Sequence, residues 1–237
     1  KIFYSFGVIA VPSTAVVDSS GSLWYGPAGY SLTTKDRIVD SLEVFLGLKK
    51  PEEAAAFRAD YRPNNKSSRF YGMALDLTLK RSWERALAIL DSAEAADTKF
   101  AGPHVLRGEI LMEMEKYGEA TAEFEKAITL DSMVVAAWAG WGRALMSDSL
   151  LDSADVKLRQ CLSLDDAYTP AKLDFGLCLA RQGKTEEALD SLGQAYELNR
   201  ADPEILYSLG IVLNQAGRQG EALEAFLDAL KLLHPGQ

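Results

Sequence analysis

The chain has few of the residues on which enzymatic chemistry most often depends. Its 237 residues include only two cysteines and two histidines. Cys161 and Cys178 do not form a CxxC motif, and His104 and His234 lie far apart in the sequence. Thiol–disulfide exchange needs a reactive thiolate, and a metal site needs several ligands close together. We therefore expect no catalytic residue, no cofactor and no metal in this chain.

Long apolar runs and an excess of positive charge are also missing. No apolar run approaches the roughly 20 residues that a helix needs to cross a bilayer, so no membrane insertion is expected. Acidic residues outnumber basic ones by 34 to 25, which gives a net charge of −9. A nucleic-acid or anionic-membrane partner would favour a basic stripe, and neither is expected here.

What the chain does have is a pattern that returns every 34 residues. Small residues recur over five copies without a single slip. The first series is Ala86, Ala120, Ala154, Ala188 and Ala222, the second is Ala93, Ala127, Cys161, Ala195 and Ala229, and the third is Ala74, Gly108, Gly142, Gly176 and Gly210. Fixed self-similarity in this range indicates stacked repeats, each too small to bury its apolar face alone.

Each repeat is predicted to hold two amphipathic helices. Positions 4, 7, 8 and 11 of the repeat share one face of the first helix, as in Trp138, Trp141, Gly142 and Leu145. A glycine inside a helix costs about 1 kcal/mol relative to alanine. Because position 8 is nevertheless glycine in four of the repeats, we expect the two helices of a repeat to approach closely there.

Turn and capping residues agree with this register. Gly183 and Gly217 are expected in the turn between the two helices of the last two repeats. Thr169 and Asp202 each precede a proline that suits the first helical position, and we expect both residues to act as N-caps.

These residues resemble the tetratricopeptide repeat family, and the resemblance covers residues 67–237. It implies repeats at 67–100, 101–134, 135–168, 169–202 and 203–236. The implied fold is all-α, a right-handed superhelix (α-solenoid) of five helix pairs. In this family the first helices line a concave groove that holds a peptide or protein segment. His104 and Arg107 depart from the family, which prefers tryptophan and leucine at those positions.

The predicted peptide-binding groove follows from a helical wheel of the first helices, on the side that faces away from the second helices. Repeat positions 5, 9, 12 and 13 supply its residues, namely Tyr71, Leu75, Val105, Glu109, Met112, Ala139, Arg143, Met146, Leu173, Leu177, Arg181, Tyr207, Ile211, Asn214 and Gln215. The groove is largely apolar, which favours an amphipathic helix or hydrophobic peptide as ligand.

Two alternatives apply to parts of this groove. Leu173, Leu177 and Ile211 can instead pack between neighbouring repeats or be covered by the N-terminal unit. Arg143 and Arg181 can contact acidic groups of a ligand, or they can pair with local carboxylates such as Glu109.

Residues 1–48 read as strand, strand and helix. Val8–Asp18 is a β-rich run broken by Pro12, and Ser22–Tyr25 can pair back on it as a second strand. The run from Val11 to Asp18, with Gly21 and Gly29, resembles the second half of a thioredoxin-like domain of the extracytoplasmic TlpA-like and peroxiredoxin-like type. The resemblance implies a cis peptide bond at Pro12 and a bacterial periplasmic or otherwise extracytoplasmic location.

The half of that domain that carries the CxxC is absent from this chain. Residues 1–48 are therefore expected to be a thioredoxin-like ββα remnant. The alternatives are a small ββα unit that never had redox chemistry, and a cytoplasmic location. Residues 49–66 are predicted to form a linker helix and a turn, with polar turn residues from Arg62 to Ser68.

We expect the chain to be a protein–protein interaction scaffold that binds a peptide or helix of a partner in the groove. The alternatives are a fragment of a thiol–disulfide oxidoreductase whose repeats recruit substrates, and a co-chaperone. The last helix, 220–233, carries leucines that no further amphipathic helix covers. This end is expected to stack on a partner or on another copy, which would make a homo-oligomer.

Overall fold

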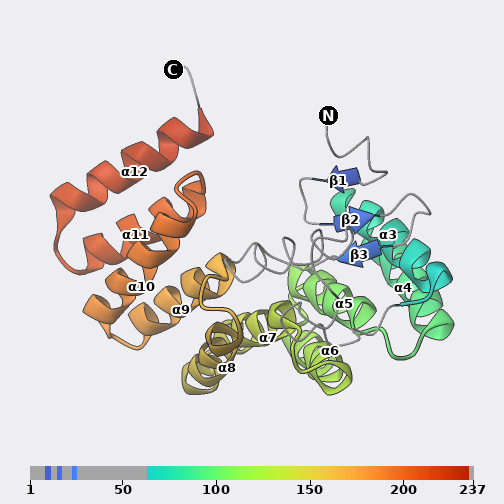
Figure 1. Cartoon of the computed structure of the whole chain (residues 1–237). Helices are drawn as coiled ribbons and strands as arrows, with labels where there is room; N and C mark the ends of the chain where they lie inside the picture. Colours follow the sequence, from blue (N-terminus) through green and yellow to red (C-terminus); the bar gives the residue numbers. More distant parts are fainter. Residues whose placement is uncertain (1–8, 12–14, 18–22, 26–62, 235–237) are drawn as a thin grey trace, which may run out of the picture. The chain divides into compact units, whose positions relative to one another are not determined.

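A computed structural model describes residues 9–11, 15–17, 23–25 and 63–234 of the chain. The chain divides into two compact units, residues 1–136 and 137–237. Within the described residues, three short strands precede ten helices (Figure 1).

The strands form one small antiparallel sheet. They are β1 (Ile9–Val11), β2 (Ala15–Val17) and β3 (Leu23–Tyr25), in the order β1-β2-β3. β2 pairs with β3 as the sequence predicts, with a register irregularity between Val16 and Val17. The run on either side of Pro12 gives two strands rather than one, because β1 pairs back on β2 with Val11 opposite Ala15.

Three predictions for the N-terminal part lie outside the described residues. These are the cis bond at Pro12, the helix of the ββα segment and the linker helix of residues 49–66. They stay predictions.

Two helices occur in each of the five predicted repeats. The helices of residues 63–136 are α3 (Asn65–Leu79), α4 (Trp83–Ala96), α5 (Gly102–Glu113) and α6 (Tyr117–Leu130). Those that follow are α7 (Val135–Ser147), α8 (Leu151–Leu164), α9 (Thr169–Arg181), α10 (Thr185–Leu198), α11 (Pro203–Gln215) and α12 (Gln219–Leu233).

The glycines at repeat position 8 are the points of closest helix approach, as predicted. A Cβ added to Gly176 would lie 2.7 Å from Cγ of Leu192, and one added to Gly210 would lie 2.5 Å from the ring of Phe226. Gly108 and Gly142 meet the bulky residue at position 24 of their own repeats in the same way. Real Cβ atoms do not approach other atoms this closely. Glycine therefore lets a large apolar side chain of the second helix pack directly against the backbone of the first.

The turn between the two helices of each repeat has one geometry throughout the described part of the chain. The residue at position 15 has positive φ in every repeat, and these residues are Arg81, Glu115, Ser149, Gly183 and Gly217. The next residue then donates its backbone N–H to the carbonyl five residues earlier, for example Lys116 to Leu111 at 2.9 Å. This is a Schellman motif, which satisfies the last carbonyls of the first helix.

Helix starts correct two details of the prediction. α3 begins at Asn65, inside the predicted polar turn, because the Asn64 side chain caps it by accepting from the Ser67 N–H at 2.8 Å. Thr169 is the first residue of α9 rather than its N-cap. Asp202 does cap α11, since its side chain accepts from the Glu204 N–H at 2.9 Å.

Candidate binding surface and a buried polar network

Within residues 137–237, repeat position 9 supplies one accessible part of the predicted groove. Arg143 of α7 is exposed, while Leu177 of α9 and Ile211 of α11 are half-buried. α9 contacts α11 directly, which brings the last two of these residues onto neighbouring first helices. Arg181, Tyr207, Asn214 and Gln215 are also exposed.

Other predicted groove residues are part of the interior. Ala139, Met146 and Leu173 are buried, and Leu173 belongs to an apolar cluster with Leu179 and Ile205. For Leu173, packing between repeats is therefore the better interpretation. Leu177 packs against the edge of the same cluster and keeps part of its side chain accessible.

Arg143 is held by one carboxylate. Its Nε and Nη2 both lie 3.0 Å from Oδ2 of Asp174, which is buried. Burial raises the pKa of Asp174 to about 6, although the positive charge of Arg143 acts in the opposite direction. Asp174 in turn raises the pKa of Arg143. The prediction that Arg143 pairs with a local carboxylate is confirmed, and the partner is Asp174 rather than Glu109.

Arg181 bonds to neutral groups instead. Its Nη1 donates to the backbone carbonyl of Met146 at 2.7 Å, and its Nη2 donates to the Ser149 hydroxyl at 3.4 Å. These two bonds fix the guanidinium beside the C-terminal end of α7. Arg143 and Arg181 are thus positively charged groups in set positions on the first helices of their repeats.

In residues 63–136 the predicted groove residues divide in the same way. Leu75 and Glu109 are exposed, Tyr71 and Met112 are half-buried, and Val105 is buried. The Tyr71 ring packs edge-on against Phe100 with centroids 5.2 Å apart. Burial, and secondly the charge of Glu109, raise the pKa of the Tyr71 hydroxyl.

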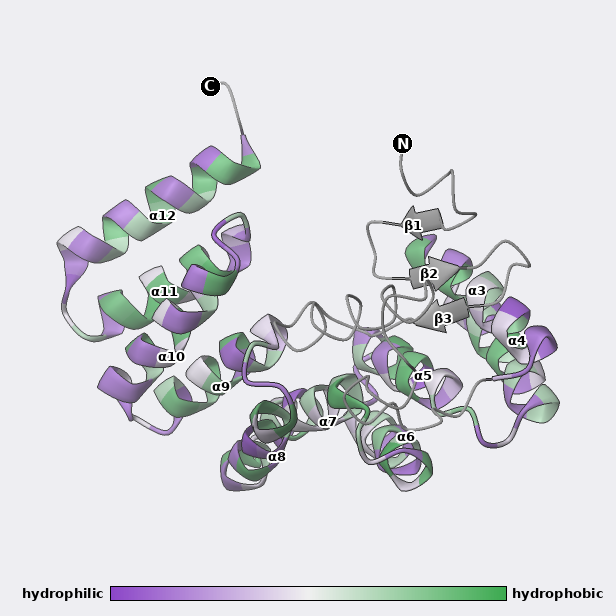
Figure 2. Cartoon of the chain, viewed as in Figure 1, coloured by the Kyte–Doolittle hydropathy of each residue, from purple (hydrophilic) through white to green (hydrophobic). Residues whose placement is uncertain are grey.

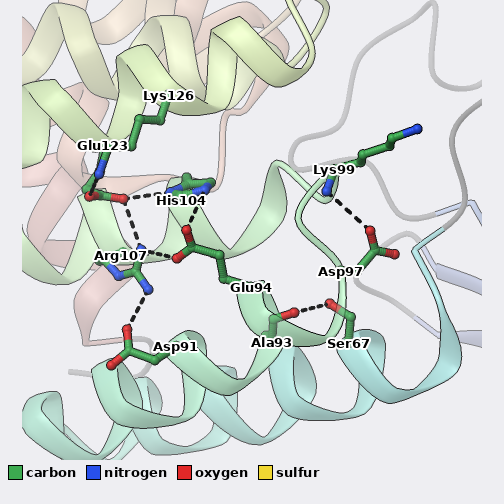
Figure 3. A network of polar contacts seen from close by, with 10 residues as sticks. All are labelled: Ser67, Asp91, Ala93, Glu94, Asp97, Lys99, His104, Arg107, Glu123 and Lys126. Carbon is green, nitrogen blue, oxygen red and sulfur yellow. Dashed lines mark hydrogen bonds and ion pairs between the residues drawn. The ribbon is translucent and has the colours of Figure 1, made fainter.

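A network of charged side chains connects α4, α5 and α6 (Figure 3). His104 Nδ1 lies 2.7 Å from Oε2 of Glu123, and both residues are buried. The Arg107 guanidinium donates to Glu94 at 2.9 Å, to Glu123 at 3.2 Å and to Asp91 at 2.8 Å.

The network keeps a buried carboxylate ionised. Burial by itself disfavours the charge on Glu123, but hydrogen bonds from His104, Lys126 and Arg107 outweigh it and lower the pKa to about 2. Glu123 and Arg107 bond to side chains of this chain, which makes the network a structural feature that ties two repeats together.

His104 is buried, and sequence reasoning missed the network to which it belongs. The available signal was the double departure of His104 and Arg107 from the residues that the family prefers. Taken together, an arginine and a histidine on an otherwise apolar helix face indicate that acidic partners lie opposite.

The remaining polar candidates offer no reactive site. Burial raises the pKa of the Cys161 thiol to about 12, and Cys178 is shifted in the same direction, so both behave as small apolar residues. Among the described residues, no cluster of His, Cys, Asp and Glu has the composition of a metal site. Nor is any helix in the described part of the chain long and apolar enough to span a bilayer.

Comparison with protein families gives two matches, both to the tetratricopeptide repeat. They cover residues 101–132 and 173–235. No curated protein sequence matches the chain.

Solved structures of tetratricopeptide repeat proteins have the same fold. YrrB, a tetratricopeptide repeat protein with an unusual peptide-binding site, is 26% identical, with a TM-score of 0.52 over 73% of this chain and 90% of YrrB. A thermophilic repeat protein of Thermus thermophilus is 19% identical, with a TM-score of 0.65 over 72% of this chain and 93% of its own.

MamA from Desulfovibrio magneticus RS-1 is 18% identical, with a TM-score of 0.60 over 74% of this chain and 99% of MamA. The two matches to the family, the fold shared with solved structures and the 34-residue register all agree. The chain therefore contains tetratricopeptide repeats.

Proposed function

We propose that the chain is a protein-interaction scaffold that binds a peptide or helix of a partner protein on the first helices of its last three repeats. The observation that carries the proposal is the series Arg143, Leu177 and Ile211. These residues occupy one repeat position on α7, α9 and α11, and each keeps part of its side chain accessible.

The likeness to YrrB supports this proposal. YrrB shares the repeat fold with this chain and has a peptide-binding site. Protein and peptide binding is also the function that suits a stack of repeats with no reactive residues in its described part.

The ligand suited to this surface has both apolar and acidic groups. Leu177 and Ile211 offer apolar contact, while Arg143 and Arg181 offer guanidinium groups whose orientation is already fixed by Asp174 and by the Met146 carbonyl. Because these side chains are held before binding, less conformational entropy is lost when a ligand carboxylate pairs with them. We therefore expect an amphipathic segment with apolar residues and at least one acidic residue.

The test is a selection of peptides from a random displayed library on the purified chain. The affinity of a selected peptide is then measured by fluorescence anisotropy for the wild type and for a Leu177→Glu, Ile211→Glu double variant. Two acidic side chains in the apolar part of the surface should lower the affinity at least tenfold, which corresponds to about 1.4 kcal/mol.

A Leu198→Glu variant is the matched control. Leu198 is also an exposed leucine, but it lies at the end of α10, on a second helix. This variant should bind the selected peptide as tightly as the wild type does. Equal affinity of the double variant and the wild type would refute the proposed surface.

The thioredoxin-like origin of residues 1–48, and the extracytoplasmic location that it implies, stay predictions. The reading frame upstream of the Lys1 codon tests them directly. A CxxC motif encoded there would support the thioredoxin-like interpretation. An upstream open reading frame without a CxxC motif and without likeness to thioredoxin would count against it.

A further inference from the structure

The last helix, α12, differs from the other second helices on the face that they turn toward the next repeat. At repeat position 25 the four earlier repeats have Asp91, Glu125, Arg159 and Gly193, whereas the last repeat has Leu227. At position 31 they have Asp97, Asp131, Asp165 and Asn199, whereas the last repeat has Leu233. The last repeat is thus apolar where the others are polar or have no side chain.

Internal repeats show what position 25 contacts. Asp91 of α4 pairs with Arg107 of the next first helix at 2.8 Å, and Arg159 of α8 lies over the Phe175 ring of the next first helix at 4.7 Å. Positions 21 and 28 flank it on the same helix face, and there the internal repeats have half-buried residues such as Leu189 and Tyr196.

On α12 the corresponding side chains are exposed and form one stripe. Leu223, Leu227 and Leu230 stand 59%, 46% and 52% exposed, and Leu233 at the end of the helix stands 58% exposed. In Figure 2 the ribbon of α12 alternates between hydrophobic and hydrophilic stretches. The spacing of four and then three residues places the first three leucines on one side of a helix, as in a coiled-coil seam.

The turn that leads into a further repeat is altered as well. Asp131 at position 31 ends α6, and its side chain accepts from the Met133 N–H at 2.9 Å, which shapes the loop to the next helix. Asp97 and Asp165 make the same bond after α4 and α8. Leucine has no side-chain oxygen that could accept this hydrogen bond, and α12 continues through Leu233. The stripe therefore does not suit one more repeat of the same kind.

The charges beside the stripe point to a partner helix of the same sequence. Glu224 and Lys231 follow Leu223 and Leu230 directly, on the same edge of the stripe, and both are exposed. Lys231 also pairs with Asp228 of its own helix at 2.7 Å, so a second copy would have to compete with or share this contact. In an antiparallel helix pair, residues on this edge of one helix meet those on the same edge of the other. Glu224 of each copy would then lie beside Lys231 of the other, as the two-fold symmetry of a homodimer requires.

We propose that α12 pairs antiparallel with α12 of a second copy of this chain. The leucine stripe forms the seam, and two symmetric Glu224–Lys231 pairs set its direction. A contact limited to one helix from each copy is small, so the dimer is expected to be weak and concentration-dependent. This inference is independent of the proposed peptide-binding surface, which uses the first helices.

The experiment is sedimentation of the full chain over a concentration series up to about 1 mM, where even a weak association is populated. The wild type should pass from monomer to dimer. Leu227→Glu should shift the midpoint at least tenfold upward in concentration. A Val156→Glu variant, which changes an exposed apolar residue of α8, should leave the midpoint unchanged.

The direction of pairing is tested by charge exchange. Glu224→Lys should weaken the dimer, and a Glu224→Lys, Lys231→Glu double variant should restore it, because the exchanged charges meet again across the two-fold axis. Circular dichroism verifies that each variant keeps its helix content. A wild type that stays monomeric throughout the series, or a dimer that Leu227→Glu leaves intact, would overturn the proposal.

Discussion

Substitution of Gly176 by alanine isolates the energetic contribution of close helix approach. The new Cβ would lie 2.7 Å from Cγ of Leu192 and 3.2 Å from the backbone carbonyl oxygen of Ala188. Leu192 is fully buried, and the carbonyl belongs to the backbone of α10. Neither atom can be displaced at low cost, so α9 and α10 must separate slightly.

The magnitude is the difference between two effects. Overpacking a well-packed core costs about 1–3 kcal/mol. Alanine in place of glycine inside a helix gains about 1 kcal/mol. Gly176→Ala should therefore lower the free energy of unfolding by up to about 2 kcal/mol. Ala74 at the same position of the first repeat indicates that the fold itself survives such a change.

Gly193 provides a control in the same helix pair. It lies in the interior of α10, and a Cβ added there would meet no atom within 4 Å. Gly193→Ala therefore receives only the gain in helix propensity, and it should stabilise the chain by about 1 kcal/mol.

Thermal unfolding followed by circular dichroism measures both variants. A chain of this length shifts its melting temperature by about 2–4 °C per kcal/mol, so the two variants should move in opposite directions. Because repeats can unfold one by one, hydrogen exchange of α9 and α10 should accompany the melts. If Gly176→Ala stabilises the chain as much as Gly193→Ala does, close approach is not the reason for the glycine.

Three further predictions follow from the described contacts. Glu115 has φ of 59°, so Glu115→Gly should relieve backbone strain and raise the free energy of unfolding by up to about 1 kcal/mol in urea titrations; a destabilised variant would refute the strain argument. Glu123 has a pKa of about 2 in the folded chain against 4.5 unfolded, so it contributes stability above pH 4.5 that is lost as the pH falls toward 2. That loss is at most about 3 kcal/mol, and Glu123→Gln should remove it from unfolding curves recorded between these pH values. Asp174 has a folded pKa of about 6 against 3.8 unfolded, so its contribution weakens as the pH rises from 3.8 to 6. Asp174→Asn should abolish that decline, and an unchanged pH profile would contradict the role of its burial.

The helical part of the fold was predictable because its signals are local and repeated. The small residues at fixed spacing predict the helix pairs, and glycine at position 8 predicts the contact with the bulky residue of the second helix. Each signal lies within one repeat, so one sequence is sufficient to find it.

What the sequence did not predict depends on other repeats or on unusual backbone geometry. Arg81, Glu115 and Ser149 take the left-handed conformation that Gly183 and Gly217 made visible only in the last two repeats. The helical wheel separated one face of the first helix from the other, but it did not separate position 5 from position 9. Leu173 is buried in a cluster with Ile205 of the next repeat, whereas Leu177 packs against the edge of that cluster and stays partly accessible.

The charged network of α4, α5 and α6 gave only an indirect signal, the departure of His104 and Arg107 from the family pattern. Asp91, Glu94, Arg107 and Glu123 come from three helices and two repeats, and only the packed structure brings them together. Until its acidic partners are known, the arginine at position 7 can be recognised only as a departure from the family pattern.

The uniform turns and boundaries of this chain have a consequence for how its length can change. Removal of residues 169–202 would join Tyr168 to Pro203 and would leave a Schellman turn inside every remaining helix pair. Length can therefore evolve in whole steps of 34 residues, by gene duplication or deletion, without the design of a new loop. Side-chain pairs between repeats restrict which steps are tolerated. Loss of residues 169–202 would also take Asp174 from Arg143, just as loss of the first repeat would take Glu94 from Arg107. In descendants of this sequence the first and second repeats, and the third and fourth, should therefore be inherited as pairs.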